Sequence, residues 1–366
     1  MTGAGHDGTG LSDVAGVRRR PTSMDVARVA GVSQSAVSRV FSKNTNVSAT
    51  MEARVRAAAA KLGYRPNVLA RSLITGRSRI IGLVVGYLDN PFYPDVLERF
   101  SEALQALGYH PLVFTTGRGA VDVERVVSEL MDYQVDGIVL ASVNLTGELA
   151  ARCRAADLPV VLFNRRTSAG DDGRGVSTIT AANVDGAGRV AEFLLDGGHR
   201  RIAHVAGWLG SSTGADRLAA FRATLEAAGQ GLHALEAGDY DRAAAAAAAR
   251  RLMARTDAPD AIFVGNDHMA LSVMDVLRHE LGADVPGDVS VVGYDDVPMA
   301  AWPSFDLTTV RQPAGRMVDA AVAEIMALIE APAARLPVHR VLEGPLIVRG
   351  SARVPADRGR APEDPT

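Results

Sequence analysis

Polar and aromatic side chains that could bind a small molecule follow short apolar runs throughout the later two thirds of the chain. They carry guanidinium, carboxylate, amide, hydroxyl and aromatic groups, and they are Phe92, Ser142, Asn164, Arg165, Thr213, Arg217, Tyr240, Asn266, Asp267, Asp295 and Trp302. If the apolar runs are parallel strands, these residues meet at the edge where open α/β sheets bind ligands. A planar guanidinium beside carboxylates, amides and aromatic faces suits a polyhydroxylated molecule such as a sugar.

A hydrolase is the competing interpretation of the same region. Residues 210–214 fit the spelling of a nucleophile elbow, and Asp295 and His339 follow in triad order. However, residues 208–210 separate the serine from the preceding apolar run, so the sharp strand-turn-helix geometry is missing. A Gly-rich Ser/Thr loop before a helix also binds ligand oxygens without chemistry. We therefore expect no enzyme activity.

No cofactor or metal is expected either. Residues 3–8 spell the dinucleotide fingerprint, but no strand precedes them and no helix follows. No Cys/His cluster has metal-ligand spacing, and no phosphate-loop motif occurs.

The elements that would position the candidate residues alternate between short apolar runs and longer amphipathic stretches. Strand candidates are 80–85, 112–115, 137–142, 160–164, 177–181, 202–206, 261–265 and 289–295. Helix candidates include 93–107, 123–132, 183–195, 215–228, 241–255 and 269–281. This alternation predicts parallel sheets with helices on both faces. Because eight such units exceed one compact sheet, we expect two lobes.

The N-terminal region contains signals for short helices separated by a glycine. Thr22 and Asp25 have the form of a capping box for a first helix, which Gly31 ends. The predicted buried face of this helix comprises Val26, Val29 and Ala30.

Ser33 is the candidate N-cap of a second short helix. Its buried residues are predicted to be Val37 and Val40, and its outward face carries Gln34, Ser35, Ser38 and Arg39. A third helix is expected over 48–62, packed through Val55, Ala59 and Leu62. Two short helices about a glycine turn predict a helix-turn-helix, whose second helix reads base edges in the major groove.

Charge favours DNA binding over the alternative of an ordinary helical hairpin with a solvated face. Residues 18–79 carry 13 Lys or Arg against two acids, Asp25 and Glu52, a local charge of +11 in a chain of net charge −3. A basic block of this kind is the electrostatic footprint of a polyanion.

Residues 67–75 predict a helix too short to be stable by itself, since isolated helices below about 12–15 residues are marginal in water. Asn67 can cap it, and Leu69 and Leu73 share one face. A linker that becomes helical only against a partner and DNA would be a switch. The alternative is that both leucines dock on the main domain.

These motifs resemble, in order, those of the lactose/galactose repressor (LacI/GalR-type) family. The headpiece and hinge resemblance rests on residues 25–39, 46–48, 62–67 and 70–73. Later segments that also resemble this family are 89–92, 136–138, 198–202, 217–221, 266–267 and 292–296. The resemblance covers roughly residues 22–351. Ser42 and Met51-Glu52 depart from the family's usual Asn and Thr-Arg, which affects the details of phosphate contact.

The resemblance implies an α/β protein with an N-terminal helix-turn-helix headpiece and a two-lobed core, like that of periplasmic binding proteins, with parallel sheets. The implied parts are a tail (1–20), headpiece (21–65), hinge (66–77), core (78–352) and second tail (353–366). Within the core, the first lobe would comprise about 79–181 and 313–342, and the second about 182–312 and 343–352.

The implied function is a ligand-responsive transcription regulator, in most family members a repressor. It would bind double-stranded, palindromic operator DNA as a homodimer, and its DNA affinity would change when an effector, most simply a sugar, binds between the lobes. A purine- or nucleoside-responsive regulator is the alternative. Ser142 and Asn164 would hold the ligand from the first lobe, and Arg217 and Asp295 from the second.

The resemblance also implies which residues contact DNA. Leu73 would wedge into the minor groove and bend the operator. The full set comprises Thr22, Ser33, Gln34, Ser35, Ser38, Arg39, Asn46, Asn67, Leu69, Arg71 and Leu73.

Composition is consistent with a cytoplasmic regulator. With 366 residues and 47% hydrophobic content, the chain can form two or three domains with real cores. Its single cysteine, Cys153, cannot form an internal disulfide, which fits a reducing compartment. Residues 1–17 do not resemble a signal peptide, and no apolar stretch approaches the roughly eighteen residues of a membrane span. We therefore expect that the protein does not bind a membrane. We also expect that it is not a freestanding solute-binding protein.

The basic block predicts DNA binding that weakens steeply with salt, because bound Arg and Lys release counterions from phosphates. Gel shifts on genomic DNA fragments at rising salt concentration test this. Replacing Gln34 or Ser35 should change the preferred sequence. An affinity that does not depend on salt would contradict the prediction.

Overall fold

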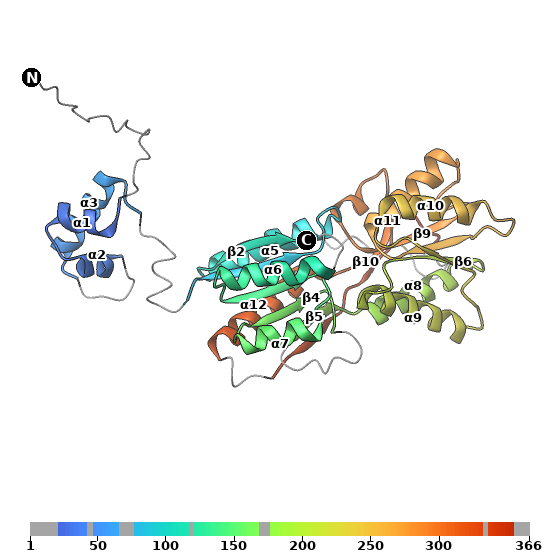
Figure 1. The fold of residues 1–366 in the computed structure, drawn as a ribbon. Coiled ribbons are helices and arrows are strands. Elements are labelled where there is room, and N and C mark those ends of the chain that lie inside the picture. The colour runs from blue at the N-terminus through green and yellow to red at the C-terminus, as the bar shows by residue number, and fades with distance from the viewer. Residues whose placement is uncertain are drawn as a thin grey trace, which may run out of the picture. The chain divides into compact units, whose positions relative to one another are not determined.

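The computed structural model describes residues 21–41, 47–65, 77–116, 120–167, 176–331 and 336–354. The chain divides into two compact units, Met1–Ser78 and Arg79–Thr366 (Figure 1).

The first unit is a bundle of three short helices, α1 (Ser23–Ala30), α2 (Gln34–Val40) and α3 (Ala49–Leu62). The predicted capping box is present, since the Thr22 side chain accepts from the Asp25 amide while the Asp25 carboxylate accepts from the Thr22 amide. Gly31 ends α1 with φ at 63°, a left-handed conformation that favours glycine. Ser33 and Ser48 cap α2 and α3 as expected.

Buried alkyl side chains hold the three helices together, and among them are Val26, Val37, Val40, Val55 and Ala59. One prediction for this unit is wrong, because Val29 is 48% exposed. The buried arc of α1 runs through Val26, Ala27 and Ala30. At about 100° per residue, Val29 lies on the other side of Val26 from Ala27, away from the helices that α1 contacts.

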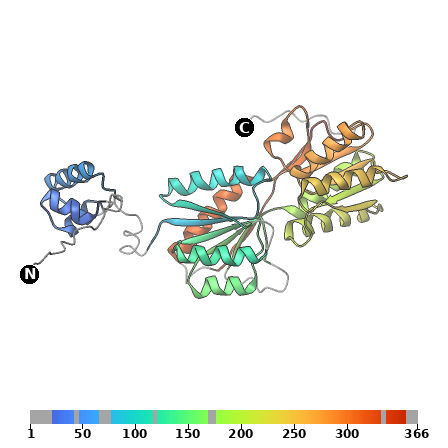
Figure 2. The ribbon, with the colours of Figure 1, turned by 45° about the horizontal axis from the view of Figure 1, so that its top comes forward.

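The second unit contains two lobes, each a six-stranded sheet between helices (Figure 2). The first sheet has the order β11-β5-β4-β3-β1-β2, with all neighbours parallel. Its strands are β1 (Ile80–Val85), β2 (His110–Thr115), β3 (Gly137–Ala141), β4 (Val160–Phe163), β5 (Ser177–Ala181) and β11 (His339–Leu342). Helices α5 (Phe92–Ala106) and α12 (Ala314–Glu330) cover one face, and α6 (Ala120–Asp132) and α7 (Gly147–Ala155) cover the other.

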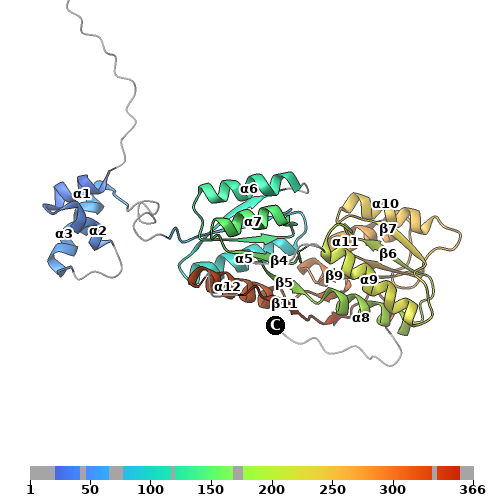
Figure 3. The ribbon, with the colours of Figure 1, turned by 60° about the horizontal axis from the view of Figure 1, so that its bottom comes forward.

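The second sheet has the order β12-β10-β9-β8-β6-β7, parallel except for the β10–β12 pair. Its strands are β6 (Ile202–Ala206), β7 (Ala234–Ala237), β8 (Ala261–Val264), β9 (Ser290–Asp295), β10 (Thr308–Arg311) and β12 (Leu346–Ile347). Helices α8 (Asn183–Asp196) and α9 (Ser212–Ala227) cover one face. Helices α10 (Arg242–Met253) and α11 (Asp267–Asp275), the latter continued by a π-helical turn (Val276–Glu280), cover the other (Figure 3).

The chain passes between the lobes three times, after β5, after β10 and after β11. The three crossovers are hydrogen-bonded to one another. The Ala182 amide donates to the Leu342 carbonyl at 2.9 Å, and the Arg311 amide donates to the Pro345 carbonyl at 2.9 Å. A movement of one lobe against the other must therefore bend all three segments together.

Every strand predicted from the sequence is present, with ends within about two residues of those expected. Strands β7, β10, β11 and β12 and helices α7 and α12 were not predicted. Strands β7 and β11 lie at sheet edges and are only partly buried, so they lack an apolar run. Strand β10 begins with two buried threonines, which carry no hydrophobic signal.

The core of the second lobe buries a histidine. His204 on β6 is 1% exposed, its ring stacks on Phe263 with centroids 4.7 Å apart, and Nδ1 donates to the Phe263 carbonyl at 2.9 Å. Burial lowers the pKa of His204 to about 4, from an ordinary value of 6.5. The imidazole is therefore neutral in the folded protein down to that pH.

We predict that His204 makes folding sensitive to mild acid. Between about pH 6.5 and 4 the unfolded chain takes up a proton at this site that the folded chain does not, so stability falls as pH drops, by about 3 kcal/mol in full. Chemical unfolding at several pH values, compared between the native chain and His204→Phe, measures the effect. The free energy of unfolding of the variant should rise relative to the native chain as pH falls, whereas parallel profiles would contradict the prediction.

Candidate functional site

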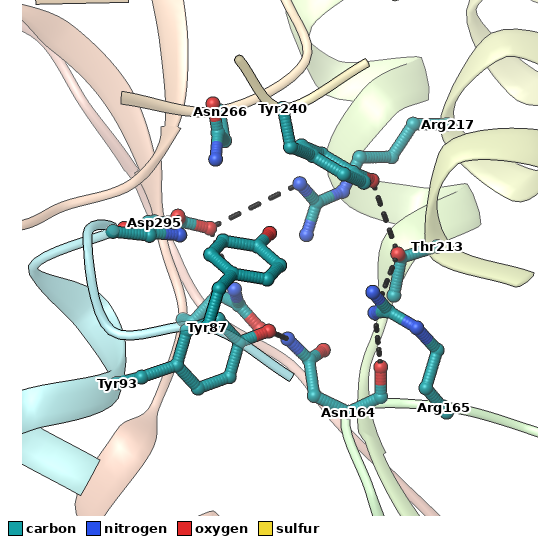
Figure 4. A pocket seen from close by; sticks show the side chains of 11 residues that line it. Tyr87, Tyr93, Asn164, Arg165, Thr213, Arg217, Tyr240, Asn266 and Asp295 are labelled. Atoms are coloured by element: carbon teal, nitrogen blue, oxygen red, sulfur yellow. Dashed lines mark hydrogen bonds and ion pairs between the residues drawn. The ribbon is translucent and has the colours of Figure 1, made fainter. Parts of the chain in front are cut away.

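A polar pocket lies between the two lobes, at the carboxyl ends of the strands. It is lined by Tyr87, Asn90, Tyr93, Asn164, Arg165, Thr213, Arg217, Tyr240, Asn266, Asp295 and Gln312. The first lobe contributes the loop after β1, the start of α5 and the end of β4, and the second contributes α9, the loops after β7 and β8, and the end of β9. Figure 4 shows the labelled side chains arranged around a common space.

Arg217 is fully enclosed and is held by groups from several elements. Its Nε donates to Asn183 Oδ1 at 2.8 Å, and its Nη1 donates to the Gly265 carbonyl at 2.6 Å. Its guanidinium carbon lies 3.6 Å from the centroid of the Tyr294 ring. Asn183 is the first residue of α8 and directly follows the first crossover, so this bond joins α9 to the start of α8 within the second lobe.

Asp295 is held in part by a crossover. Its carboxylate accepts from Gln312 Nε2 at 2.6 Å and from Asn90 Nδ2 at 3.2 Å, and it lies 3.9 Å from Arg217 Nη1. Burial raises the pKa of Asp295, and the Arg217 guanidinium is the largest influence in the opposite direction. Gln312 lies in the crossover after β10, whereas Asn90 comes from the first lobe.

Arg165 crosses from the first lobe to the second. Its Nη1 donates to Thr213 Oγ1 at 2.9 Å and to the Asn164 carbonyl at 2.8 Å, and its Nη2 donates to Ser142 Oγ at 2.7 Å. At the rim, Asn144 Nδ2 donates to the Gly210 carbonyl at 3.1 Å, and Arg166 forms an ion pair with Asp216. The lobes are therefore in polar contact around the pocket.

Four lining residues have a buried polar atom with no hydrogen-bond partner. The donors are Arg165 Nε and Arg217 Nη2, and the acceptors are Asn164 Oδ1 and Gln312 Oε1. Buried polar groups in folded proteins are normally paired, so unpaired groups around one space indicate the place of a ligand.

The backbone is strained at four residues that line the pocket or lie next to it. Ser142, Asn164, Tyr240 and Asp295 all have positive φ, at 62°, 57°, 58° and 134°. Such conformations cost on the order of 1–3 kcal/mol each in non-glycine residues and gather at functional sites. Gly207 permits the approach of Tyr240, because a Cβ there would come within 2.2 Å of the Tyr240 ring.

Seven of the eleven ligand-binding residues expected from the sequence line this pocket: Asn164, Arg165, Thr213, Arg217, Tyr240, Asn266 and Asp295. The other four do not. Phe92 is buried edge-on against Tyr93, with centroids 5.3 Å apart, and Ser142 lies behind Arg165. Asp267 accepts from Thr309 Oγ1 at 2.6 Å and from the Val297 amide at 3.0 Å, and Trp302 is 54% exposed.

Four lining residues were missed by the sequence analysis. Tyr87 follows β1 by two residues, so the rule applied to the other strand ends would have found it. Asn90 and Tyr93 lie within two residues of Phe92, the residue that the sequence predicts. Gln312 follows β10, a strand with no apolar run, and sequence carries no signal for it.

The hydrolase interpretation is not supported by the geometry. Ser212 Oγ accepts from the Arg166 amide at 3.0 Å, Asp295 is bound to Asn90 and Gln312, and His339 Nδ1 is 2.9 Å from Thr178 Oγ1. The three residues of the supposed triad therefore make separate contacts. Within the described ranges, no group of three His, Cys, Asp or Glu side chains could hold a metal ion. None of the described helices has the length and apolar character of a membrane span.

The first unit presents the predicted DNA-reading face. Ser33, Gln34, Ser35, Ser38 and Arg39 are exposed along α2. Gln34 Nε2 donates to Ser23 Oγ at 3.0 Å, and the Ser33 and Ser35 hydroxyls are 2.9 Å apart, whereas the Thr22 hydroxyl is engaged in the capping box. The remaining predicted contacts, Asn46, Asn67, Leu69, Arg71 and Leu73, lie outside the described residues.

Comparison with known proteins agrees with this architecture of a helical head and a two-lobed binding core. Residues 22–67 match the family described as bacterial regulatory proteins, lacI family, and residues 191–352 match the periplasmic binding protein-like domain. The transcriptional regulator CelR of Thermobifida fusca is 34% identical over 91% of this chain and 99% of its own. The ribose operon repressor of Escherichia coli is 32% identical over 90% of this chain and 99% of its own.

Solved structures of regulators with this architecture are similar to the chain. The lac repressor dimer bound to operator and an anti-inducer has a TM-score of 0.80 at 28% identity and covers 91% of this chain and 99% of its own. A complex of CelR with cellobiose has a TM-score of 0.69 at 33% identity and covers 91% of this chain and 100% of its own.

A helix-turn-helix head joined to a two-lobed core defines a ligand-responsive, DNA-binding transcription regulator. The chain belongs to the lacI family of bacterial regulatory proteins. The predicted fold class and the predicted class of function are both confirmed.

Asp267 gives a pH-dependent test of the region behind the pocket. Burial, followed by repulsion from Asp295, raises the pKa of Asp267 to about 7 from an ordinary 3.8. Between these values the folded chain holds a proton that the unfolded chain has lost, so stability falls as pH rises towards about 7 and levels off above it.

We predict that Asp267→Asn removes this loss. The Asn amide can donate to Thr309 while its oxygen accepts from the Val297 amide, which preserves both contacts. The melting temperature of the variant relative to the native chain should therefore increase between pH 5 and pH 8. A constant difference over that range would contradict the prediction.

Proposed function

We propose that the pocket between the lobes binds a sugar and that its occupancy changes operator affinity. The observation that carries the proposal is the chemistry of the lining. None of the described lining residues is purely apolar, and Arg165, Arg217 and Asp295 are each at least 96% buried among amides and tyrosines. A sugar offers hydroxyls around its whole rim, whereas a purine has two broad apolar faces, so this lining favours the sugar over the purine alternative.

Relatives support this choice of ligand class. A regulator 33% identical to this chain has been solved with cellobiose, and another relative is named for the ribose operon. The lac repressor structure is a dimer on operator. By analogy, this protein acts as a dimeric repressor on a palindromic operator in the cytoplasm, with no catalytic activity of its own.

The crossovers would transmit the effect of ligand binding from the pocket to the DNA-binding headpieces. Asp295 is bonded to Gln312 in the crossover after β10. Arg217 is bonded to Asn183, which begins α8 directly after the crossover that follows β5. Both charged residues that face the ligand are therefore bonded in or next to a segment joining the lobes. A ligand that forms hydrogen bonds with Arg217 or Asp295 competes with the bonds that these residues make to Asn183 and Gln312. The resulting shift of one lobe against the other alters how two paired heads meet their half-sites, a coupling that is typically 1–3 kcal/mol.

We predict that Asp295→Ala and Arg217→Ala remove the response at effector concentrations that suffice for the native chain and leave operator binding without effector intact. A lost hydrogen bond to a charged group costs roughly 1.5–3 kcal/mol, or about 10- to 100-fold in effector Kd. The effector is first identified by a thermal-shift screen of sugars and nucleosides. Fluorescence anisotropy on operator DNA, with and without effector, then measures both quantities.

Trp302→Ala is the matched control, because Trp302 is exposed and does not line the pocket. It should respond to effector like the native chain. If both pocket variants still respond at unchanged effector concentrations, the pocket is not the effector site. Stabilisation by nucleosides alone would refute the choice of a sugar.

A further inference from the structure

The pocket carries an excess of positive charge. Arg165 and Arg217 both line it, and Asp295 is the one carboxylate among the described lining residues. Asp295 lies beside Arg217, at 3.9 Å. The hydrogen-bond partners of Arg165 are all neutral, namely the Asn164 carbonyl and the hydroxyls of Thr213 and Ser142. With Arg165 2% exposed, water cannot screen its charge.

Neighbouring charges do not remove this excess. Outside the lining, Asp296 is paired with Arg311 and Arg349, and Arg166 is paired with Asp216. Asp267 lies behind Asp295, and burial raises its pKa to about 7, so it is only partly ionised at neutral pH. The guanidinium of Arg165 therefore has no dedicated counter-charge among the described residues.

Both arginines present an unpaired donor. Arg165 Nε and Arg217 Nη2 are buried and have no hydrogen-bond partner. The unpaired acceptors Asn164 Oδ1 and Gln312 Oε1 belong to the same lining. A ligand that satisfies all four must accept from two cations and donate to two amide oxygens.

Burying a cation without a partner is costly, and a carboxylate or phosphate is the group that guanidinium binds most strongly. We propose that the effector is an anionic sugar, a sugar acid or a sugar phosphate. Its negative group accepts from Arg165 and Arg217, and its hydroxyls donate to Asn164 and Gln312. Arg165 is then the residue that sets specificity for the charged ligand. This inference rests on the proposed sugar-binding function.

The test measures Kd by titration calorimetry on the full-length protein with matched ligands. Each set contains a neutral sugar, its uronic acid and its 6-phosphate, in the glucose and galactose series, with ribose and ribose 5-phosphate added. In at least one set the anionic member should bind about tenfold more tightly than its neutral parent. Preference for the acid or for the phosphate identifies which of the two sources supplies the charge.

Three variants make the test specific. Arg165→Gln should reduce the preference for the anion to about twofold or less. Arg166→Gln removes the same charge from the adjacent residue, which is half exposed and paired with Asp216, and should keep the native preference. Asn164→Asp adds the missing carboxylate beside Arg165 and should shift the preference towards neutral sugars by about tenfold, which tests the idea even if Arg165→Gln folds poorly.

The outcomes separate the two proposals. Neutral sugars that bind as tightly as their anionic partners would overturn the charge inference and leave the sugar-binding function standing. An unchanged preference in both Arg165→Gln and Asn164→Asp would also overturn it. Binding of no sugar in any set would refute the proposed function itself.

Discussion

The burial of Arg217 is the constraint around which the core is arranged. A guanidinium that is 2% exposed needs hydrogen-bond partners inside the protein, and the partners of Arg217 Nε and Nη1 come from distant parts of the chain. Asn183 supplies an acceptor from the start of α8, Gly265 supplies a carbonyl directly after β8, and Tyr294 on β9 supplies a ring face. Fixing this one side chain therefore fixes the relative positions of the start of α8 and two strands.

In the proposed function, this arrangement lets a ligand in the pocket bias the position of one lobe against the other. The crossovers are bonded to one another through backbone groups, so they bend together. Gln312 in one crossover holds Asp295, and Asn183, which directly follows another, holds Arg217. Packed interfaces of this kind switch between discrete states and do not deform continuously. Polar contacts such as Arg165 to Thr213 already join the lobes, so the ligand of the proposed function would redistribute existing hydrogen bonds and would not create the interface.

The helices of the first unit depend mainly on local interactions. Its three helices are short, and each is defined by a local cap, Thr22, Ser33 or Ser48, with a small alkyl core between them. Because caps act within one turn, sequence predicted these helices correctly. The single error, Val29, concerned which side of α1 its neighbours cover, and this depends on packing between helices and not on capping.

The same division holds for the whole chain. Strand and helix identities follow from short-range periodicity, so the alternating elements, the parallel sheets and seven lining residues could be predicted from sequence. Whether a side chain at a strand end faces the pocket, as Asp295 does, or lies behind it, as Asp267 does, depends on contacts with segments far away in sequence. Gln312 shows this most clearly, because only the crossing of the lobes brings it to Asp295. Local interactions thus decide which elements form, and tertiary packing decides which of their residues meet.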